Sequence, residues 1–244
     1  MMNSIDRAIE VINDRGNIVA FTGAGISVES GIPPFRGSDG LWSKYDPMIL
    51  DLVYYNQHSD ESWPVIKELF FDFFGKAKPN AAHIGLAKME QKGILKSIIT
   101  QNIDNLHQIA GNTEVNEFHG NSVQFVCMHC AAVHKRADLI LTEEPPKCAN
   151  CGGLLKPDFV FFGEEIPKAA MEKSILAAQT ADVLLIIGTT GEIMPASQLP
   201  YLAKQNNAVV IEINIEKSNF TDSITDIFIQ EKATKAMSEI IINV

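Results

Sequence analysis

The densest group of side chains able to perform chemistry or to bind a metal lies between residues 119 and 151. His119-Gly120 comes first, and the four cysteines of the chain follow as two C-x-x-C pairs separated by 17 residues: Cys127, Cys130, Cys148 and Cys151. Two thiolate pairs on tight turns can converge on one tetrahedral zinc ion and leave no coordination position open for a substrate. The spacing therefore predicts a structural zinc site, with the reaction chemistry elsewhere.

Two other interpretations of this region were weighed against structural zinc. The cysteines could be redox pairs or free thiols, but their paired spacing favours zinc. His129 lies between the first two cysteines and could be a ligand, but four cysteines already complete a tetrahedron, so it is left out of the predicted set. His119 is the better candidate for chemistry, because an imidazole titrates near neutral pH and can act as a general base.

Size and charge limit the possible classes of protein. A chain of 244 residues can bury one large core with a small added module. Its formal charge of −10 argues against nonspecific binding to nucleic acid or to an anionic membrane and favours basic partners. No apolar run approaches the roughly 20 residues that span a bilayer, and the N-terminus lacks the features of a signal peptide. With all cysteines assigned to zinc, we expect a cytoplasmic location.

The elements that must position these groups alternate between strands and helices. Strands are predicted at 17–21, 98–100, 183–187 and 209–213, and each runs into a polar or glycine-rich turn. Helices are predicted near 83–91, 169–180, 197–205 and 235–242. This alternation predicts an α/β fold with a Rossmann-like, doubly wound parallel sheet, in which ligands bind at the carboxyl ends of the strands. A smaller zinc-ribbon and helical domain is expected as an insertion.

The expected organisation divides the chain into three parts. Residues 1–31, 80–120 and 158–244 form the Rossmann-like domain. Residues 32–79, irregular and rich in aromatic side chains, form a helical or flexible insertion, and residues 121–157 form the zinc module.

Gly23-x-Gly25 follows the first predicted strand and could let backbone N–H groups approach a pyrophosphate. The motif alone is weak, because a G-x-G pair is often only a turn. Val28 stands where the usual dinucleotide fingerprint has its third glycine, and no acidic residue ends a second strand at the expected distance. An ordinary dehydrogenase is therefore disfavoured.

Longer segments carry a more specific signal. The segments 23–37, 100–107, 118–120, 160–164 and 214–216, together with the cysteine pairs, resemble the signatures of the bacterial-type sirtuins in the family's order. Sirtuins are NAD-dependent protein deacylases with one structural zinc ion. The resemblance implies that the protein removes acyl groups from lysine side chains of protein substrates, transfers them to ADP-ribose and releases nicotinamide.

The resemblance also implies a role for individual residues. His119 would act as general base for a ribose hydroxyl, and Asn102 and Asp104 would form the nicotinamide pocket. The full NAD-binding set it implies is Gly23, Ala24, Gly25, Ser27, Val28, Phe35, Arg36, Gln101, Asn102, Ile103, Asp104, His119, Gly188, Thr189, Thr190, Asn214, Ile215, Glu216, Lys232 and Ala233. An extended acyl-lysine peptide would lie against Val160, Phe162, Gly163, Glu164, Glu192 and Ile193.

The chain departs from the family pattern at a few positions. Pro34 replaces the usual acidic residue or threonine, and Gly191 stands where leucine is common, which leads us to expect a looser wall near the peptide. No Tyr-x-x-Arg pair of the kind that marks succinyl or malonyl removal occurs between 54 and 78, so neutral acyl groups are expected. Two alternatives stay open: ADP-ribosyl transfer to a protein by the same NAD site, and a noncatalytic NAD-binding module. The sequence does not fix the oligomeric state.

Overall fold

The computed structural model describes residues 3–35 and 40–244 of the chain. Its larger sheet is parallel, with strands in the order β3-β2-β1-β7-β8-β9. These strands are β1 (Ile18–Thr22), β2 (Leu95–Thr100), β3 (Val115–Glu117), β7 (Val183–Ile187), β8 (Val209–Asn214) and β9 (Ile227–Gln230). The chain runs outward from β1 in both directions, so the order of the strands reverses between β1 and β7. Ligands bind at the carboxyl edge of such a sheet beside this switch point.

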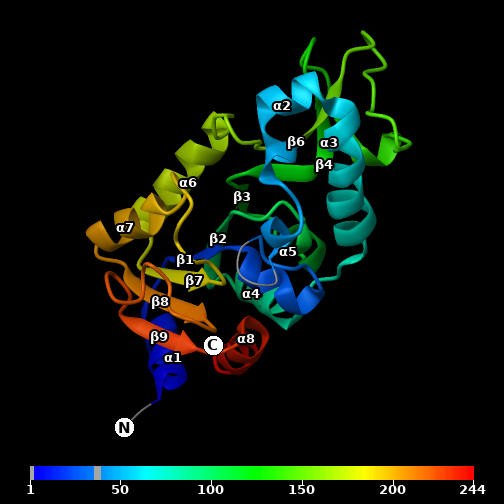
Figure 1. Ribbon diagram of the computed structural model, residues 1–244. Helices are drawn as coiled ribbons and strands as arrows, with labels where there is room; N and C mark the ends of the chain where they lie inside the picture. The colour runs from blue at the N-terminus through cyan, green and yellow to red at the C-terminus, as the bar shows by residue number, and fades with distance from the viewer. Residues whose placement is uncertain (1–2, 36–39) are drawn as a thin grey trace.

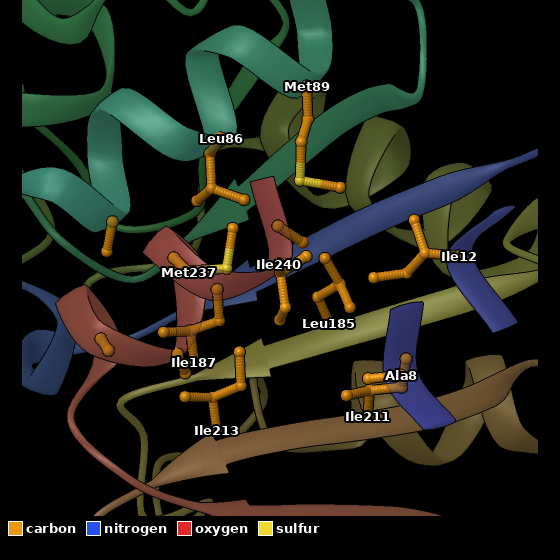
Figure 2. Close-up of a cluster of buried hydrophobic side chains, with 14 of the residues drawn as sticks. Ala8, Ile12, Leu86, Met89, Leu185, Ile187, Ile211, Ile213, Met237 and Ile240 are labelled. Atoms are coloured by element: carbon orange, nitrogen blue, oxygen red, sulfur yellow. The ribbon is translucent and has the colours of Figure 1, made fainter. Parts of the chain in front are cut away.

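Helices cover both faces of the parallel sheet (Figure 1). Alternate side chains of β7 point to opposite faces, as the pleat of a strand requires. Leu185 and Ile187 pack with α1 (Ser4–Asp14), α4 (Ala81–Gln91) and α8 (Ala233–Ile242), and Figure 2 shows this cluster. Leu184 and Ile186 pack on the other face with α6 (Lys168–Thr180) and α7 (Gln198–Gln205). Continuous apolar strands are therefore buried on both sides, as expected for a doubly wound sheet.

A second, antiparallel sheet has the order β5-β4-β6 and lies beside α2 (Leu52–Gln57) and α3 (Ser59–Ile66) (Figure 1). Its strands are β4 (Gly120–Cys127), β5 (Val133–Lys135) and β6 (Leu155–Phe159). The predicted helical insertion and the predicted zinc module share one core here. Tyr55 and Trp63 pack with Phe125 and Leu155, and the Tyr55 hydroxyl donates to the Leu155 carbonyl at 2.9 Å.

Shorter elements complete the described chain. α5 spans Leu106–Ala110, a π-helical stretch spans Lys67–Phe73, and 3₁₀ turns span Ala24–Ser30, Leu41–Ser43, Pro47–Leu50, Phe74–Lys76 and Arg136–Asp138. Within residues 3–35 and 40–244, no helix is both long enough and apolar enough to cross a bilayer.

The predicted fold class is confirmed, and its four strands are found close to their expected bounds. The strands β3 and β9 were missed. β3 has three residues of mixed character, Val115-Asn116-Glu117, and both strands lie at the edges of the sheet. Both strands are buried less than the central ones, β3 has no apolar run, and the apolar run of β9, Ile227-Phe228-Ile229, has only three residues.

Candidate active site at the carboxyl edge of the sheet

Two glycine turns meet at the switch point between β1 and β7. The Gly25 N–H donates to the Gly188 carbonyl at 2.8 Å, and the Gly23 N–H donates to the Ile187 carbonyl at 3.0 Å. A Cβ atom added to Gly25 would lie 2.7 Å from the Gly188 backbone, and one added to Gly23 would lie 2.7 Å from the Gly188 carbonyl oxygen. Only glycine lets these turns approach so closely, and the result is a cradle lined by backbone at the ligand-binding edge.

A small pocket lies next to this cradle, where the turn after β2 faces the 3₁₀ turn after β1. Its lining combines apolar and polar groups: Ala24, Ser27, Ile32, Phe35, Phe74, Asn102, Ile103 and Asp104. The Asn102 amide donates to the Gly23 carbonyl at 3.1 Å and to the Ser27 hydroxyl at 3.3 Å. The pocket is therefore a slot with apolar walls and an amide and a carboxyl group at one side.

Asp104 is held by two hydrogen bonds. The Ser27 hydroxyl donates to one carboxyl oxygen at 2.7 Å, and the Leu106 N–H donates to the other at 2.9 Å, so the side chain also caps α5. Burial raises the pKa of Asp104 above its usual value, and the bond from Ser27 opposes this rise in part. The carboxyl group is thus fixed in direction at the side of the pocket.

A buried polar network below the pocket was not found from sequence. His107 Nε2 lies 3.0 Å from the Thr22 hydroxyl, which donates to the Thr100 hydroxyl at 2.9 Å, and the Asn102 N–H donates to that hydroxyl at 3.1 Å. Burial holds the pKa of His107 well below its usual range, so the ring is neutral. Since Thr22 already uses its proton on Thr100, the proton of His107 lies on Nε2. The network fixes the backbone at Asn102.

The ring of His119 is hydrogen-bonded to the turn after β2, which also carries Asn102 and Asp104. Its Nδ1 lies 3.0 Å from the Gln101 carbonyl oxygen. Burial lowers the pKa of His119 below the ordinary value of 6.5, and the Gln101 carbonyl opposes this in part. At neutral pH the ring is therefore neutral, and the carbonyl can accept only from Nδ1–H. The lone pair is left on Nε2, which is the arrangement a general base requires.

This arrangement predicts the acidic side of the pH profile. A base with a lowered pKa stays unprotonated to lower pH, so activity should persist below the ordinary histidine pKa. We expect the acidic limb of kcat/KM to have its inflection below pH 6.5, measured with a peptide that carries no group titrating between pH 5 and 8. An inflection above pH 6.5 would contradict the assigned state of His119.

The turns after β7 and β8 lie on the far side of the cradle. Thr189, in the turn after β7, is hydrogen-bonded to both neighbouring turns. Its hydroxyl accepts from Gln101, after β2, at 3.1 Å, and its carbonyl accepts from the Asn214 amide, at the end of β8, at 3.0 Å. Glu212, fully buried in β8, accepts hydrogen bonds from Asn214 and from the hydroxyl groups of the following loop, Ser218, Thr221 and Thr225. Glu212 thus holds the loop after Asn214 against the sheet, a role that no pattern in the sequence indicated.

The remaining predicted residues on this side are spread around the turns. Ile215 is exposed, and so is Glu216. Lys232 precedes α8, and its ammonium lies 3.9 Å from Glu29, whose carboxylate also accepts from Thr234 at the start of that helix. The first turn of α8 is thereby joined to the 3₁₀ turn that contains Val28. Arg36 belongs to the predicted set but lies outside the residues that the structure describes.

Gly191 is surrounded differently from our expectation of a looser wall. Its φ of +74° is in the left-handed region, and an added Cβ atom would lie 2.7 Å from the Phe220 ring. The ring of Phe220 therefore fills the space into which a Gly191 side chain would extend. The Asn219 N–H, next to Phe220, donates to the Thr190 carbonyl at 3.0 Å and connects the loop after β8 to this turn.

Replacing Gly191 with alanine should therefore disturb the site. The left-handed backbone costs an alanine roughly 1–2 kcal/mol, and the contact with Phe220 adds to it. We expect kcat/KM to fall by about tenfold or more. Gly93→Ala is the matched control, since Gly93 has a φ of +73° but open space at its Cβ position. If both variants kept the wild-type kcat/KM, the proposed contact with Phe220 would have no functional weight.

The predicted peptide-side segment runs from Val160 to Glu164 and is already paired in part. The Val160 N–H donates to the His119 carbonyl at 2.8 Å, and Phe162 exchanges backbone hydrogen bonds with Leu50 and Leu52. The Phe162 side chain is half exposed. Glu164 turns inward, with Oε2 2.9 Å from Lys156 Nζ. On the opposite side, the predicted residues Glu192 and Ile193 follow Gly191 in the turn after β7.

The four cysteines converge at one end of the small sheet. Their sulfur atoms all lie within 4.8 Å of one another, with Cys127–Cys151 at 3.5 Å and Cys130–Cys148 at 3.8 Å. Four sulfurs bonded to zinc at 2.3 Å lie about 3.8 Å apart, so the cluster fits this ion. The N–H groups of Cys130 and His129 point at Cys127 and lower its pKa to about 6, whereas the sulfur atoms of Cys130 and Cys127 raise the pKa of Cys151 to about 12. A metal that binds this cluster therefore displaces protons.

His134 was not singled out from sequence, yet its Nε2 lies 3.3 Å from Cys148 Sγ. It follows the second cysteine on β5, the strand that leads away from the first knuckle, and its spacing offered no signal. The contact comes from the pairing of β5 with β4.

The fold and these turns together define an α/β protein of the dinucleotide-binding class with an attached cysteine metal module. The chain belongs to the Sir2 family, whose model matches residues 23–195. Over 235 residues it is 42% identical to an NAD-dependent protein deacylase of Pyrococcus furiosus, covering 91% of each chain. Over 243 residues it is 39% identical to an NAD-dependent protein deacylase of Pyrococcus abyssi, covering 95% of this chain and 94% of the relative.

Solved structures give the same family. A mutant of a Sir2 homologue in complex with ADP-ribose is similar with a TM-score of 0.93 and 35% identity, covering 98% of this chain and 95% of that one. A structure of Sir2 with a p53 peptide and NAD+ is similar with a TM-score of 0.89 and 32% identity, covering 97% and 96%. The predicted family is therefore confirmed.

Proposed function

We propose that this chain is an NAD-dependent protein lysine deacylase, which transfers an acyl group from lysine to ADP-ribose and releases nicotinamide. Membership of the Sir2 family and its similarity to NAD-dependent protein deacylases support this. The observation that carries the proposal is the position of His119. Its ring is bonded to Gln101, at the start of the turn that supplies Asn102 and Asp104 to the small pocket.

The residues present fit NAD. The turns of Gly23, Gly25 and Gly188 pack backbone against backbone at the carboxyl edge of the sheet, where a dinucleotide binds in this fold class. The pocket of Asn102 and Asp104 has the mixed lining that an aromatic carboxamide needs. When bound, NAD supplies a ribose carbon with nicotinamide as its leaving group. Asn102 and the Ser27–Asp104 pair orient the carboxamide, while Phe35 and Phe74 exclude water.

His119 is assigned the proton transfer. Its Nε2 lone pair takes a proton from a ribose hydroxyl, and the Gln101 carbonyl stabilises the ring as it becomes charged. The adenosine half is assigned to Thr189, Asn214 and Glu216, with Lys232 and Ala233 beside the adenine. Phe162, Gly163 and Glu192 are assigned to the flanks of the acyl-lysine peptide, which adds as a strand between two segments.

Further parts of the proposal rest on other observations. One zinc ion, held by the four cysteines, is structural. The division into a Rossmann-like domain and an inserted module is supported by their separate apolar clusters. Neutral acyl groups and a cytoplasmic location are supported only by the sequence, through the missing Tyr-x-x-Arg pair and the metal-assigned cysteines.

The test is an incubation with acyl-lysine peptides that carry acetyl, longer neutral acyl or succinyl groups, with and without NAD. We expect NAD-dependent loss of the neutral acyl groups, detected by the mass of the peptide. ADP-ribosylation of protein without loss of the acyl group would instead support the transferase alternative. NAD binding with no release of nicotinamide would support a noncatalytic module.

A further inference from the structure

Lys156 in β6 is a buried lysine for which the reaction chemistry has no use. Only 7% of its surface is exposed, whereas lysine is almost never buried unless it is paired. Its ammonium donates to the Pro157 carbonyl at 2.8 Å and to the Phe159 carbonyl at 2.7 Å, and lies 2.9 Å from Glu164 Oε2. The three N–H donors of the ammonium therefore meet three oxygens.

Two further contacts close this cluster. The ammonium lies 4.4 Å from the centre of the Phe161 ring, within the range of a cation–π contact. The same oxygen of Glu164 accepts from the Phe161 N–H at 2.7 Å. Lys156 thus bonds to one end of the segment 157–164 through its backbone carbonyls and to the other end through Glu164. The segment is curved around a single ammonium group.

This segment is the one that borders the predicted peptide site. Its first three residues belong to β6, and its Val160 N–H donates to the His119 carbonyl. The half-exposed Phe162 and Gly163, at a φ of +90°, come just before its last residue, Glu164. Its curvature therefore sets where the Phe162 side chain and the backbone of Gly163 lie relative to His119. Lys156 itself is buried and does not line the pocket described above.

We propose that Lys156, through Glu164, is the positioning residue that holds segment 157–164 in the shape that accepts the acylated peptide. The proposal rests on the proposed function, since it assumes a peptide substrate on this segment. Lys156 touches neither peptide nor NAD; it acts on the peptide side alone, because none of its partners belongs to the turns after β1, β2, β7 or β8.

The experiment compares Lys156→Met, Lys156→Arg and Glu164→Gln with the wild type in steady-state deacylation, with NAD affinity measured separately by calorimetry. Lys156→Met keeps an unbranched side chain only one atom shorter and removes the charge, so we expect the KM for the peptide to rise about tenfold or more, as for the loss of a buried charged hydrogen bond. Both kcat and NAD affinity should stay within about twofold. Lys156→Arg should restore part of the loss, and Glu164→Gln should raise the same KM.

Lys67→Met is the matched control. Lys67 also lies in the small domain, the unit that packs around the antiparallel sheet. It pairs with two carboxylates, Asp72 and Glu143, and neither of them belongs to segment 157–164. Lys67→Met should leave the peptide KM unchanged. If Lys156→Met lowers only the melting temperature and the active fraction, and also leaves the peptide KM unchanged, Lys156 has a merely structural role and the proposal is overturned. If Lys156→Met does not fold, Glu164→Gln decides, and an unchanged peptide KM there also overturns it. If the wild type does not deacylate any peptide, the proposed function fails and this inference with it.

Discussion

His119→Ala should abolish deacylation while the protein still binds NAD. A positioned general base contributes about 10²–10⁴-fold to the rate. His119 can serve as this base, because its Nδ1 is hydrogen-bonded to the Gln101 carbonyl in the turn after β2 and the lone pair is therefore on Nε2. The variant removes the ring but leaves the Gln101 backbone and the pocket of Asn102 and Asp104 intact. We expect kcat for peptide deacylation to fall by at least about 10²-fold, with NAD affinity, measured by calorimetry, nearly unchanged.

His58→Ala is a suitable control for this experiment. His58 is exposed between α2 and α3, its Nδ1 lies 3.3 Å from Glu61, and it does not line the pocket of Asn102 and Asp104. It should keep wild-type kcat. A His119→Ala variant with normal activity would remove His119 from the reaction, and a variant that lost NAD binding as well would show that the ring holds NAD rather than moves a proton.

Loss of the metal should have the second large effect, on stability. Cys127 and Cys148 belong to the same apolar cluster as Trp63 and Phe125, so the metal site is continuous with the core of the small domain. Binding of structural zinc is coupled to folding. We expect Cys148→Ala to release zinc and to lower Tm by roughly 10 °C or more, since 1 kcal/mol shifts Tm by about 2–4 °C at this chain length. Peptide deacylation should be lost with the small domain.

The matched control for Cys148→Ala is a substitution of His129, which lies between the first two cysteines in the sequence. His129 is exposed, and four cysteines already complete the tetrahedron, so His129→Ala should keep one zinc ion per chain and the wild-type Tm. Metal content is read by atomic emission and Tm by calorimetry. Retention of zinc in Cys148→Ala, or an unchanged Tm after chelation, would refute a structural role for the metal.

The sequence was sufficient where one local pattern determines the structure. Five consecutive apolar residues, Val183–Ile187, predicted a strand buried on both faces, and β7 has these bounds. The C-x-x-C spacing predicted the convergence of four sulfur atoms, because each pair lies on its own tight turn. His119 was found from its resemblance to a family segment, but the state of its ring depends on the Gln101 carbonyl, which the tertiary fold supplies.

Other parts of the site depend on contacts between distant segments and could not be predicted. Lys156 looks like an ordinary surface lysine in the sequence, and only the curvature of the following segment brings Glu164 and two carbonyl groups around it. From the sequence, Gly191 suggested an empty space where a leucine side chain is common in the family. The structure places the Phe220 ring, from the loop after β8, in that space. Glu212 is buried, and the partners that the described residues give it are hydroxyl groups and the Asn214 amide, which no local pattern indicates.

The most direct test of the central claim is the balance of products with an acetyl-lysine peptide and NAD. A deacylase of the proposed kind releases one nicotinamide and forms one O-acetyl-ADP-ribose for each acetyl group lost. We predict this ratio of one to one to one, measured by chromatography and mass spectrometry, and its absence in His119→Ala. Free acetate formed without consumption of NAD, or nicotinamide released while the peptide keeps its acetyl group, would contradict the account.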